Sequence, residues 1–130
     1  MGITINRGRE AGKPSELRSD TFTGEVWGDP VLAKTDGVLM NNVFFAPRGR
    51  THWHRHERGQ VLVVTAGRGR VYDRDGDGGP IAAGDVVFIP PDLEHWHGAD
   101  SESYLLHLAV SLGTTEWLDA VTDEDYDRHS

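Results

Sequence analysis

The stretch Gly49-Arg50-Thr51-His52-Trp53-His54-Arg55-His56-Glu57-Arg58-Gly59-Gln60 decides how the rest of the chain is interpreted. It holds three of the seven histidines, at alternate positions. In a β-strand alternate side chains point to one face, so an extended conformation places His52, His54 and His56 on the same side. Buried imidazoles need polar partners. A metal ion is the simplest single partner for such a row.

A second cluster, Glu94-His95-Trp96-His97, repeats the alternating pattern. His107 lies between two leucines in an apolar segment that reads as another strand. Gln60 follows a glycine turn and can supply an amide oxygen. The chain contains no cysteine, so a metal would be held by imidazole, amide or carboxylate groups rather than by thiolates.

Length and charge exclude several classes of protein. A chain of 130 residues suits one domain with one core, which we assign to residues 1–130. A formal net charge of −8 argues against a nucleic-acid partner and against an anionic membrane surface. The N-terminal sequence has no apolar signal region, and no apolar run reaches bilayer length. We therefore expect a cytoplasmic protein.

The order of the expected elements indicates an all-β fold. Residues 1–20 are interpreted as an extended N-terminal arm, and residues 114–130 as a helical tail in which 114–121 form a helix capped by Thr114 or Thr115. Short strands are expected between them, at residues 21–26, 38–45, 60–65, 70–73, 86–89, 95–97 and 105–110. Many short strands separated by glycine and proline favour an antiparallel barrel or sandwich.

Two of these segments resemble the motifs of a known family. The first cupin motif is matched by His54, His56, Gln60 and Gly67, and the second by Gly84, Pro90 and His95. The chain thus resembles a small single-domain cupin. That resemblance implies a jelly-roll β-sandwich or barrel with a metal inside the barrel mouth.

The sequence departs from the usual cupin pattern at three positions. Gln60 stands where the first motif usually has a glutamate, which lowers the formal charge of the site. Asp92 and Ala99 stand where the second motif usually has glycine and asparagine.

A narrower pattern resembles two groups of bacterial cupins. The sequence Arg50-Thr51-x-Trp53-His54-x-His56-x-x-Gly59-Gln60, followed by His95-Trp96-His97-Gly98-Ala99, is similar to cupins with manganese-dependent hydroxynitrile lyase activity. In size and class the chain also resembles the monodomain cupin polyketide cyclases of actinobacteria. The resemblance implies one divalent ion per chain, zinc or manganese ahead of iron, nickel or cobalt. Its ligands would be His54, His56, Gln60 and His95.

The remaining polar residues are candidates for proton transfer and substrate contact. His97 and His107 are expected to line the cavity as neutral acid/base catalysts. His52 is a third catalytic candidate, with a further ligand or a solvated strand residue as alternatives. The apolar strand at residues 38–45 would supply a cavity wall that includes Asn41 and Val43.

Together these features predict a metal-dependent enzyme that acts on a carbonyl compound by Lewis-acid and histidine catalysis. The first interpretation is a polyketide cyclase of secondary metabolism and antibiotic biosynthesis that promotes aldol-type ring closure. A hydroxynitrile lyase, a metal-dependent dioxygenase and a non-catalytic small-molecule-binding cupin are the alternatives. A homodimer is also expected, because the arm carries Ile3 and Ile5 and because Trp53 and Trp96 should face outward.

Overall fold

The structure is a computed structural model that describes residues 2–7 and 14–129. Its elements, in order, are β1 (Glu16–Arg18), β2 (Phe22–Thr23), β3 (Val26–Thr35), β4 (Val38–Phe45), β5 (Arg50–Thr51), β6 (His54–His56), β7 (Gln60–Asp73), β8 (Gly78–Ala82), β9 (Val86–Ile89), β10 (His95–Ala99), β11 (Leu105–Leu112), β12 (Thr115–Trp117) and α1 (Asp123–Asp127). Within the described part of the chain no helix has the length and apolarity needed to cross a membrane.

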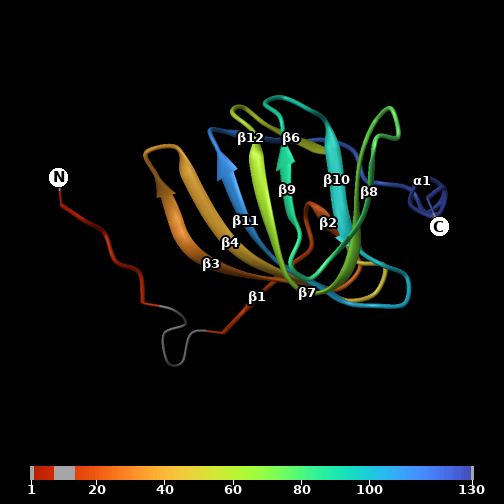
Figure 1. The fold of residues 1–130 in the computed structure, drawn as a ribbon, viewed down its shortest axis with the longest axis horizontal. Helices are drawn as coiled ribbons and strands as arrows, with labels where there is room; N and C mark the ends of the chain where they lie inside the picture. The colour runs from red at the N-terminus through yellow and green to blue at the C-terminus, as the bar shows by residue number, and fades with distance from the viewer. Residues whose placement is uncertain (1, 8–13, 130) are drawn as a thin grey trace.

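The strands form a nearly closed antiparallel barrel with one short helix at the C-terminal end (Figure 1). One side of the barrel runs β1-β3-β4-β11-β7-β9, and the other joins β8, β10, β5, β2, β6 and β12 around the second half of β7. This arrangement confirms the expected all-β cupin-type barrel with a short C-terminal helix.

Strand β7 belongs to both sides of the barrel. Its residues 60–67 pair with β11, and its residues 69–73 pair with β10. Gly67 lies where the strand turns from one side to the other, with a φ of +77° and an irregular register beside it. A Cβ at this position would lie 2.0 Å from the carbonyl oxygen of Tyr104, so glycine is required there. Residues 60–65 and 70–73, which were expected to form two strands, are thus parts of one continuous strand bent at this glycine.

Side-chain alternation in β11 shows how the barrel interior is filled. Leu105, His107, Ala109 and Ser111 are buried, and each residue between them is half-buried. The same strand therefore gives the interior two apolar side chains, Leu105 and Ala109, in alternation with two polar ones, His107 and Ser111. The alternation along β11 therefore directs His107 into the barrel interior.

The two tryptophans next to the histidines point away from the barrel interior, as expected, and they are buried by packing within the chain and not left exposed for a subunit contact. Trp53 is 5% exposed and Trp96 is 1% exposed. They pack with Tyr72, Val121 and Tyr126 in a second apolar cluster. The physical reason is that the C-terminal segment folds back over this side of the barrel.

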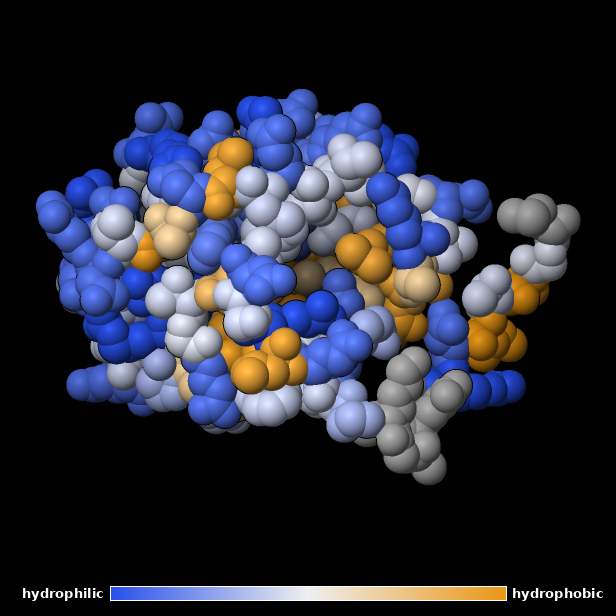
Figure 2. All heavy atoms as spheres, turned by 180° about the vertical axis from the view of Figure 1, so that it is seen from behind, coloured by the Kyte–Doolittle hydropathy of each residue, from blue (hydrophilic) through white to orange (hydrophobic). Residues whose placement is uncertain are grey.

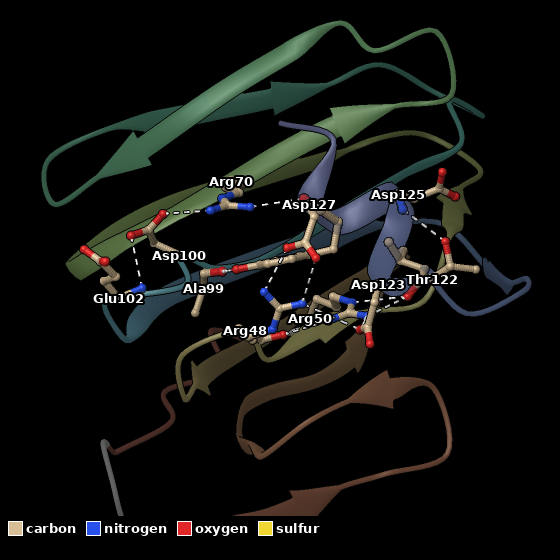
Figure 3. A network of polar contacts seen from close by, with 12 residues as sticks. Arg48, Arg50, Arg70, Ala99, Asp100, Glu102, Thr122, Asp123, Asp125 and Asp127 are labelled. Carbon is tan, nitrogen blue, oxygen red and sulfur yellow. Dashed lines mark hydrogen bonds and ion pairs between the residues drawn. The ribbon is translucent and has the colours of Figure 1, made fainter. Parts of the chain in front are cut away.

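That segment is fastened by the buried ring of Tyr126, which has three guanidinium groups within 4.8 Å of its centroid. Figure 3 shows these groups, which belong to Arg48, Arg50 and Arg70. The Tyr126 hydroxyl donates to the carbonyl oxygen of Ala99 at 2.6 Å. Arg50 donates to the Val121 carbonyl at 2.8 Å, and Arg70 donates to the Tyr126 carbonyl at 3.1 Å. Buried hydrogen bonds to charged donors are stronger than neutral ones, so these contacts fix the path of the tail.

The helix expected at residues 114–121 is wrong. Thr115–Trp117 forms β12, which pairs with β6, and the helix comes later, at Asp123–Asp127, with Thr122 as its N-cap. Apolar spacing over eight residues is a weak signal. Here the open edge of β6 supplied backbone partners that overrode it.

The strand expected at residues 21–26 is also divided. Phe22–Thr23 forms β2, Gly24 turns with a φ of +84°, and β3 begins at Val26. Strand β3 then continues through Pro30, where the register with β4 shifts. Proline cannot donate to a ladder, and such an irregularity is where a strand accommodates it.

The N-terminal arm is partly incorporated into the barrel. Residues 16–18 pair with β3 as an edge strand. Residues 2–7 have no regular secondary structure and lie away from the barrel (Figure 1), with Ile3 93% exposed. Residues 1 and 8–13 of the predicted arm lie outside the described residues.

The predicted homodimer stays a prediction, and the outer face of the β9-β7-β11 side replaces the tryptophans as its candidate surface. Val86 and Phe88 of β9 are 67% and 65% exposed, and the outward residues of β11 are Leu106, Leu108 and Val110. Contiguous exposed apolar surface of this kind commonly marks an interface.

We expect Phe88→Lys to dissociate the dimer, so that light scattering measures the mass of a monomer. The thermal unfolding of that monomer should be unchanged by the substitution. A dimer that persists in Phe88→Lys would exclude this face.

Candidate metal centre

Three strands bring five of the predicted site histidines together. Strand β6 carries His54 and His56, strand β10 carries His95 and His97, and strand β11 carries His107. The pairing of β10 with β6 sets His95 directly opposite His54. All five side chains are buried, at 3% exposure or less. The cluster thus arises from strand register rather than from proximity in the sequence.

The distances within the cluster suit a shared metal ion. Ligand nitrogens of His54, His95 and His97 lie within 4.8 Å of one another. The His54 ring lies 4.2 Å from the His95 ring and 5.0 Å from the His56 ring, measured between centroids. These buried histidines could therefore hold one metal ion.

In each of three imidazoles the Nδ1 atom, here called the outer nitrogen, contacts an oxygen atom. The Nδ1 atoms of His54 and His95 donate to the carbonyl oxygens of His52 and Leu93, each at 2.9 Å. The Nδ1 atom of His56 lies 2.9 Å from the hydroxyl oxygen of Thr115. A carbonyl oxygen can only accept, so His54 and His95 carry their proton on Nδ1 and present a lone pair on Nε2. Metal-binding histidines are usually held in this way.

The residues present fit a metal ion. The Nε2 atom of His95 lies 3.2 Å from the Gln60 Oε1 atom, and in this tautomer both are acceptors. The amide nitrogen of Gln60 is turned away and donates to Ser111 at 3.0 Å. The Nε2 atom of His56 is buried without a partner. Two facing lone pairs and a buried unpaired nitrogen are costly. A cation among them would bind the lone pairs of His95 and Gln60, and also that of His56 when Thr115 accepts the proton of its Nδ1 atom.

Burial also keeps these imidazoles neutral. It lowers the pKa of His56, His95 and His107 to about 4. Burial also lowers the pKa of His54 well below its ordinary value, with neighbouring His95 adding to the effect. Neutral imidazole is the form that binds a metal ion, so the site is preset for one.

His97 and His107 form a pair on the other side of the cluster. His107 Nε2 and His97 Nδ1 lie 3.0 Å apart, so one of them donates to the other. His97 Nε2 and His107 Nδ1 are both buried without a partner. Burial lowers the pKa of His97 well below its ordinary value, and His107 adds to this effect. The pair is a connected set of neutral imidazoles beside the candidate ligands.

His52 enters the site through its backbone rather than its side chain. Its carbonyl orients His54, while the half-buried imidazole takes no part in the ring contacts among the described histidines. Its predicted catalytic role has no geometric support among the described residues. The reason is that His52 lies just before β6 begins, where the alternation of side chains has not yet started.

Sequence reasoning missed the residues that β12 and β11 contribute. Thr115 contacts His56, Ser111 holds Gln60, and Trp117 stacks on His54 with 4.6 Å between ring centroids. Thr115 and Trp117 were assigned to a helix. Their role depends on the pairing of β12 with β6, for which the sequence gives no signal.

A cavity of about 460 Å³ lies beside the cluster. Predicted wall residues Asn41 and Val43 line it, together with the segment at residues 17–22, Leu39 and Trp117. His97 and His107, which were also expected to line the cavity, are not among its lining residues because both are buried behind it. Val43 pairs with His107 across the β4–β11 ladder. Figure 2 shows the molecule hollowed on the face opposite Figure 1, with apolar residues inside a mostly hydrophilic rim.

Comparison with known proteins identifies the family. Residues 42–111 match the family described as Cupin domain. The chain belongs to the cupin family. It is 40% identical over 116 residues to a protein named (R)-mandelonitrile lyase from Granulicella tundricola, covering 85% of this chain and 88% of that protein.

Solved cupin structures have the same barrel. A cupin-like protein from Thermotoga maritima superposes with a TM-score of 0.86 at 36% identity, covering 94% of this cupin and 98% of that chain. The polyketide cyclase RemF from Streptomyces resistomycificus superposes with a TM-score of 0.73 at 18% identity, covering 95% and 92% of the two chains. The second likeness concerns the fold alone.

Acid should destabilise the metal-free protein through these histidines. An unfolded chain protonates them below about pH 6.5, whereas His56, His95 and His107 stay neutral in the folded chain down to a pKa of about 4. The contribution of these histidines to the free energy of unfolding is therefore fully present above about pH 6.5. It falls as the pH drops toward 4, by roughly 1.4 kcal/mol per pH unit for each histidine. Urea unfolding at pH 7 and pH 5 in chelator measures this. Equal free energies of unfolding at the two pH values would contradict buried neutral imidazoles.

Metal content should depend on the cluster and not on His52. Elemental analysis of the purified protein is expected to find about one ion per chain, lost in His54→Ala and in His95→Ala because each substitution removes a ligand. His52→Ala is the control, since it retains the backbone carbonyl that orients His54 and should keep the ion. An ion that survives both ligand substitutions would exclude this site.

Proposed function

We propose that this cupin is a metal-dependent lyase that cleaves a cyanohydrin to a carbonyl compound and hydrogen cyanide. The observation that carries the proposal is the set of three buried imidazoles whose Nδ1 atoms contact oxygen atoms, with the Nε2 atom of His95 3.2 Å from the amide oxygen of Gln60. The 40% identity to a mandelonitrile lyase over most of both chains supports this reaction. A bound divalent ion would supply Lewis acidity that polarises the substrate oxygen.

The partners of each imidazole suggest a division of roles. His54, His56 and His95 have outer nitrogens held by oxygen atoms, which is the environment of a ligand. We assign them and Gln60 to the metal. The ligand nitrogens that lie within 4.8 Å of one another are those of His54, His95 and His97, so His97 lies directly beside this ligand set. His97 has another imidazole as its outer partner, which can both accept and donate a proton. We therefore assign His97 to proton transfer and His107 to positioning it.

The proton transfers of the cleavage need only the substrate and the pair of His97 and His107. With His97 Nδ1–H donating to His107 Nε2, the His97 Nε2 atom is a free acceptor. It takes the hydroxyl proton of the cyanohydrin, the oxygen electrons form the carbonyl bond, and the carbon–cyanide bond breaks with its electron pair on cyanide. His97 then returns the proton to cyanide. The buried surroundings of the pair exclude water from this exchange.

The polyketide cyclase interpretation, which the sequence places first, takes second place. It would use the same polarised oxygen and the same imidazole pair for an aldol closure. Its structural support is the likeness to RemF, at 18% identity. The lyase is preferred because its relative is matched at 40% identity.

The assay is release of cyanide and benzaldehyde from mandelonitrile by the metal-loaded protein. His97→Ala should lower kcat by about 10²-fold or more, because it removes the proton acceptor, while elemental analysis finds the metal retained. Loss of metal in His97→Ala would make His97 a ligand and contradict the division of roles. Absence of cyanide release, with a cyclised product from a poly-β-keto substrate, would reverse the order of the two reactions.

A further inference from the structure

Trp117 is the side chain that the cavity and the histidine cluster share. It lines the cavity, and its indole stacks on the His54 imidazole with 4.6 Å between centroids and 30° between planes. The histidines themselves are not among the residues that line the cavity. A molecule bound in the cavity against Trp117 would therefore lie next to the ring that borders the candidate metal centre.

Phe22 completes an aromatic surface on the same side. Its ring lies 5.5 Å from the Trp117 ring at 54°, and 6.3 Å from the Phe45 ring. Phe45 in turn packs 5.2 Å from His107. Two rows of rings thus lead from the cavity to the cluster, one through Trp117 to His54 and the other through Phe22 and Phe45 to His107.

Trp117 is also unusually exposed for an inward aromatic residue. It is 39% exposed, on a strand of three residues that pairs with β6. Apolar surface in a concave site gains free energy when a ligand removes it from water. Strand pairing fixes the position of this surface, because Trp117 lies opposite His54 in the ladder.

We propose that Trp117 and Phe22 form an aryl-binding subsite, so that Trp117 determines the specificity of the enzyme for substrates with an aromatic ring. The proposal rests on the proposed function in that the ring belongs to the cyanohydrin. Aromatic pairs of this tilted or offset kind contribute beyond their buried area. The polar lining residue Asn41 and the apolar residue Val43 then face the non-aromatic end of the substrate, on the strand beside His107.

Binding to the metal-free protein tests the subsite without any turnover. The probes are benzyl alcohol and isobutanol, titrated and followed by NMR. Trp117→Ala should weaken benzyl alcohol binding up to about tenfold and change isobutanol binding by less than about twofold. Trp117→Phe should restore most of the difference, since it restores a ring. Trp27→Ala is the matched control, because the Trp27 indole bonds to Glu25 and does not line the cavity.

Kinetics then separate this proposal from the proposed function. With metal-loaded protein, Trp117→Ala should raise KM for mandelonitrile more than KM for acetone cyanohydrin, with metal content unchanged. Equal weakening of both probes, or none, would overturn the aryl subsite even if mandelonitrile is cleaved. Selective benzyl alcohol binding without cyanide release would overturn the lyase and leave the subsite standing.

Discussion

The pairing of β10 with β6 is the constraint on which the candidate site depends. It sets His95 opposite His54, so that two imidazoles from segments about forty residues apart meet inside the barrel. Because side chains alternate along a strand, the same register also brings His56 and His97 inward. A slip of one residue in β10 would turn His95 and His97 away from the interior and replace them with Trp96, and a slip in β6 would replace His54 and His56 with Trp53 and Arg55. The register is therefore a condition for metal binding as well as for folding.

The C-terminal segment stabilises that register from outside. Trp53 and Trp96 occupy the opposite faces of the strands that carry the ligands, and the tail buries both. Tyr126 and the arginines around it hold the tail in place. Strand β12 then follows the edge of β6 and delivers Thr115 to His56 and Trp117 to His54. One segment thus covers the outer apolar cluster and completes the inner polar one.

The sequence predicted the elements whose signal is local and missed those that depend on a distant partner. Strand Val38–Phe45 and strand Val86–Ile89 lie at the predicted residues, because each is a short apolar run bounded by turn residues. The histidines of the two cupin motifs were also identified from the sequence, because alternation and family motifs both depend on residues that lie close together in the chain. By contrast, β12 was mistaken for a helix, and the sequence did not distinguish packing of Trp53 and Trp96 within the chain from a subunit contact. The first depends on the pairing of β12 with β6 and the second on the tail that covers both tryptophans, and such tertiary interactions are absent from the local pattern.

The partners of the outer nitrogens give a physical basis for dividing a crowded histidine cluster into roles. Five neutral imidazoles so close together would be interchangeable by composition and by burial alone. A fixed oxygen acceptor locks a ring into one tautomer and orients its other lone pair, as the His52 and Leu93 carbonyls do for His54 and His95. An imidazole acceptor leaves the tautomer free to exchange, as in the pair of His97 and His107. Rings of the first kind suit a static bond to a metal ion, and rings of the second kind suit a proton that must move and return. The two kinds are neighbours, because His97 follows His95 by two residues on β10 and its ring centroid lies 5.2 Å from that of His54. A proton held by the pair of His97 and His107 therefore lies directly beside the rings assigned to the metal ion.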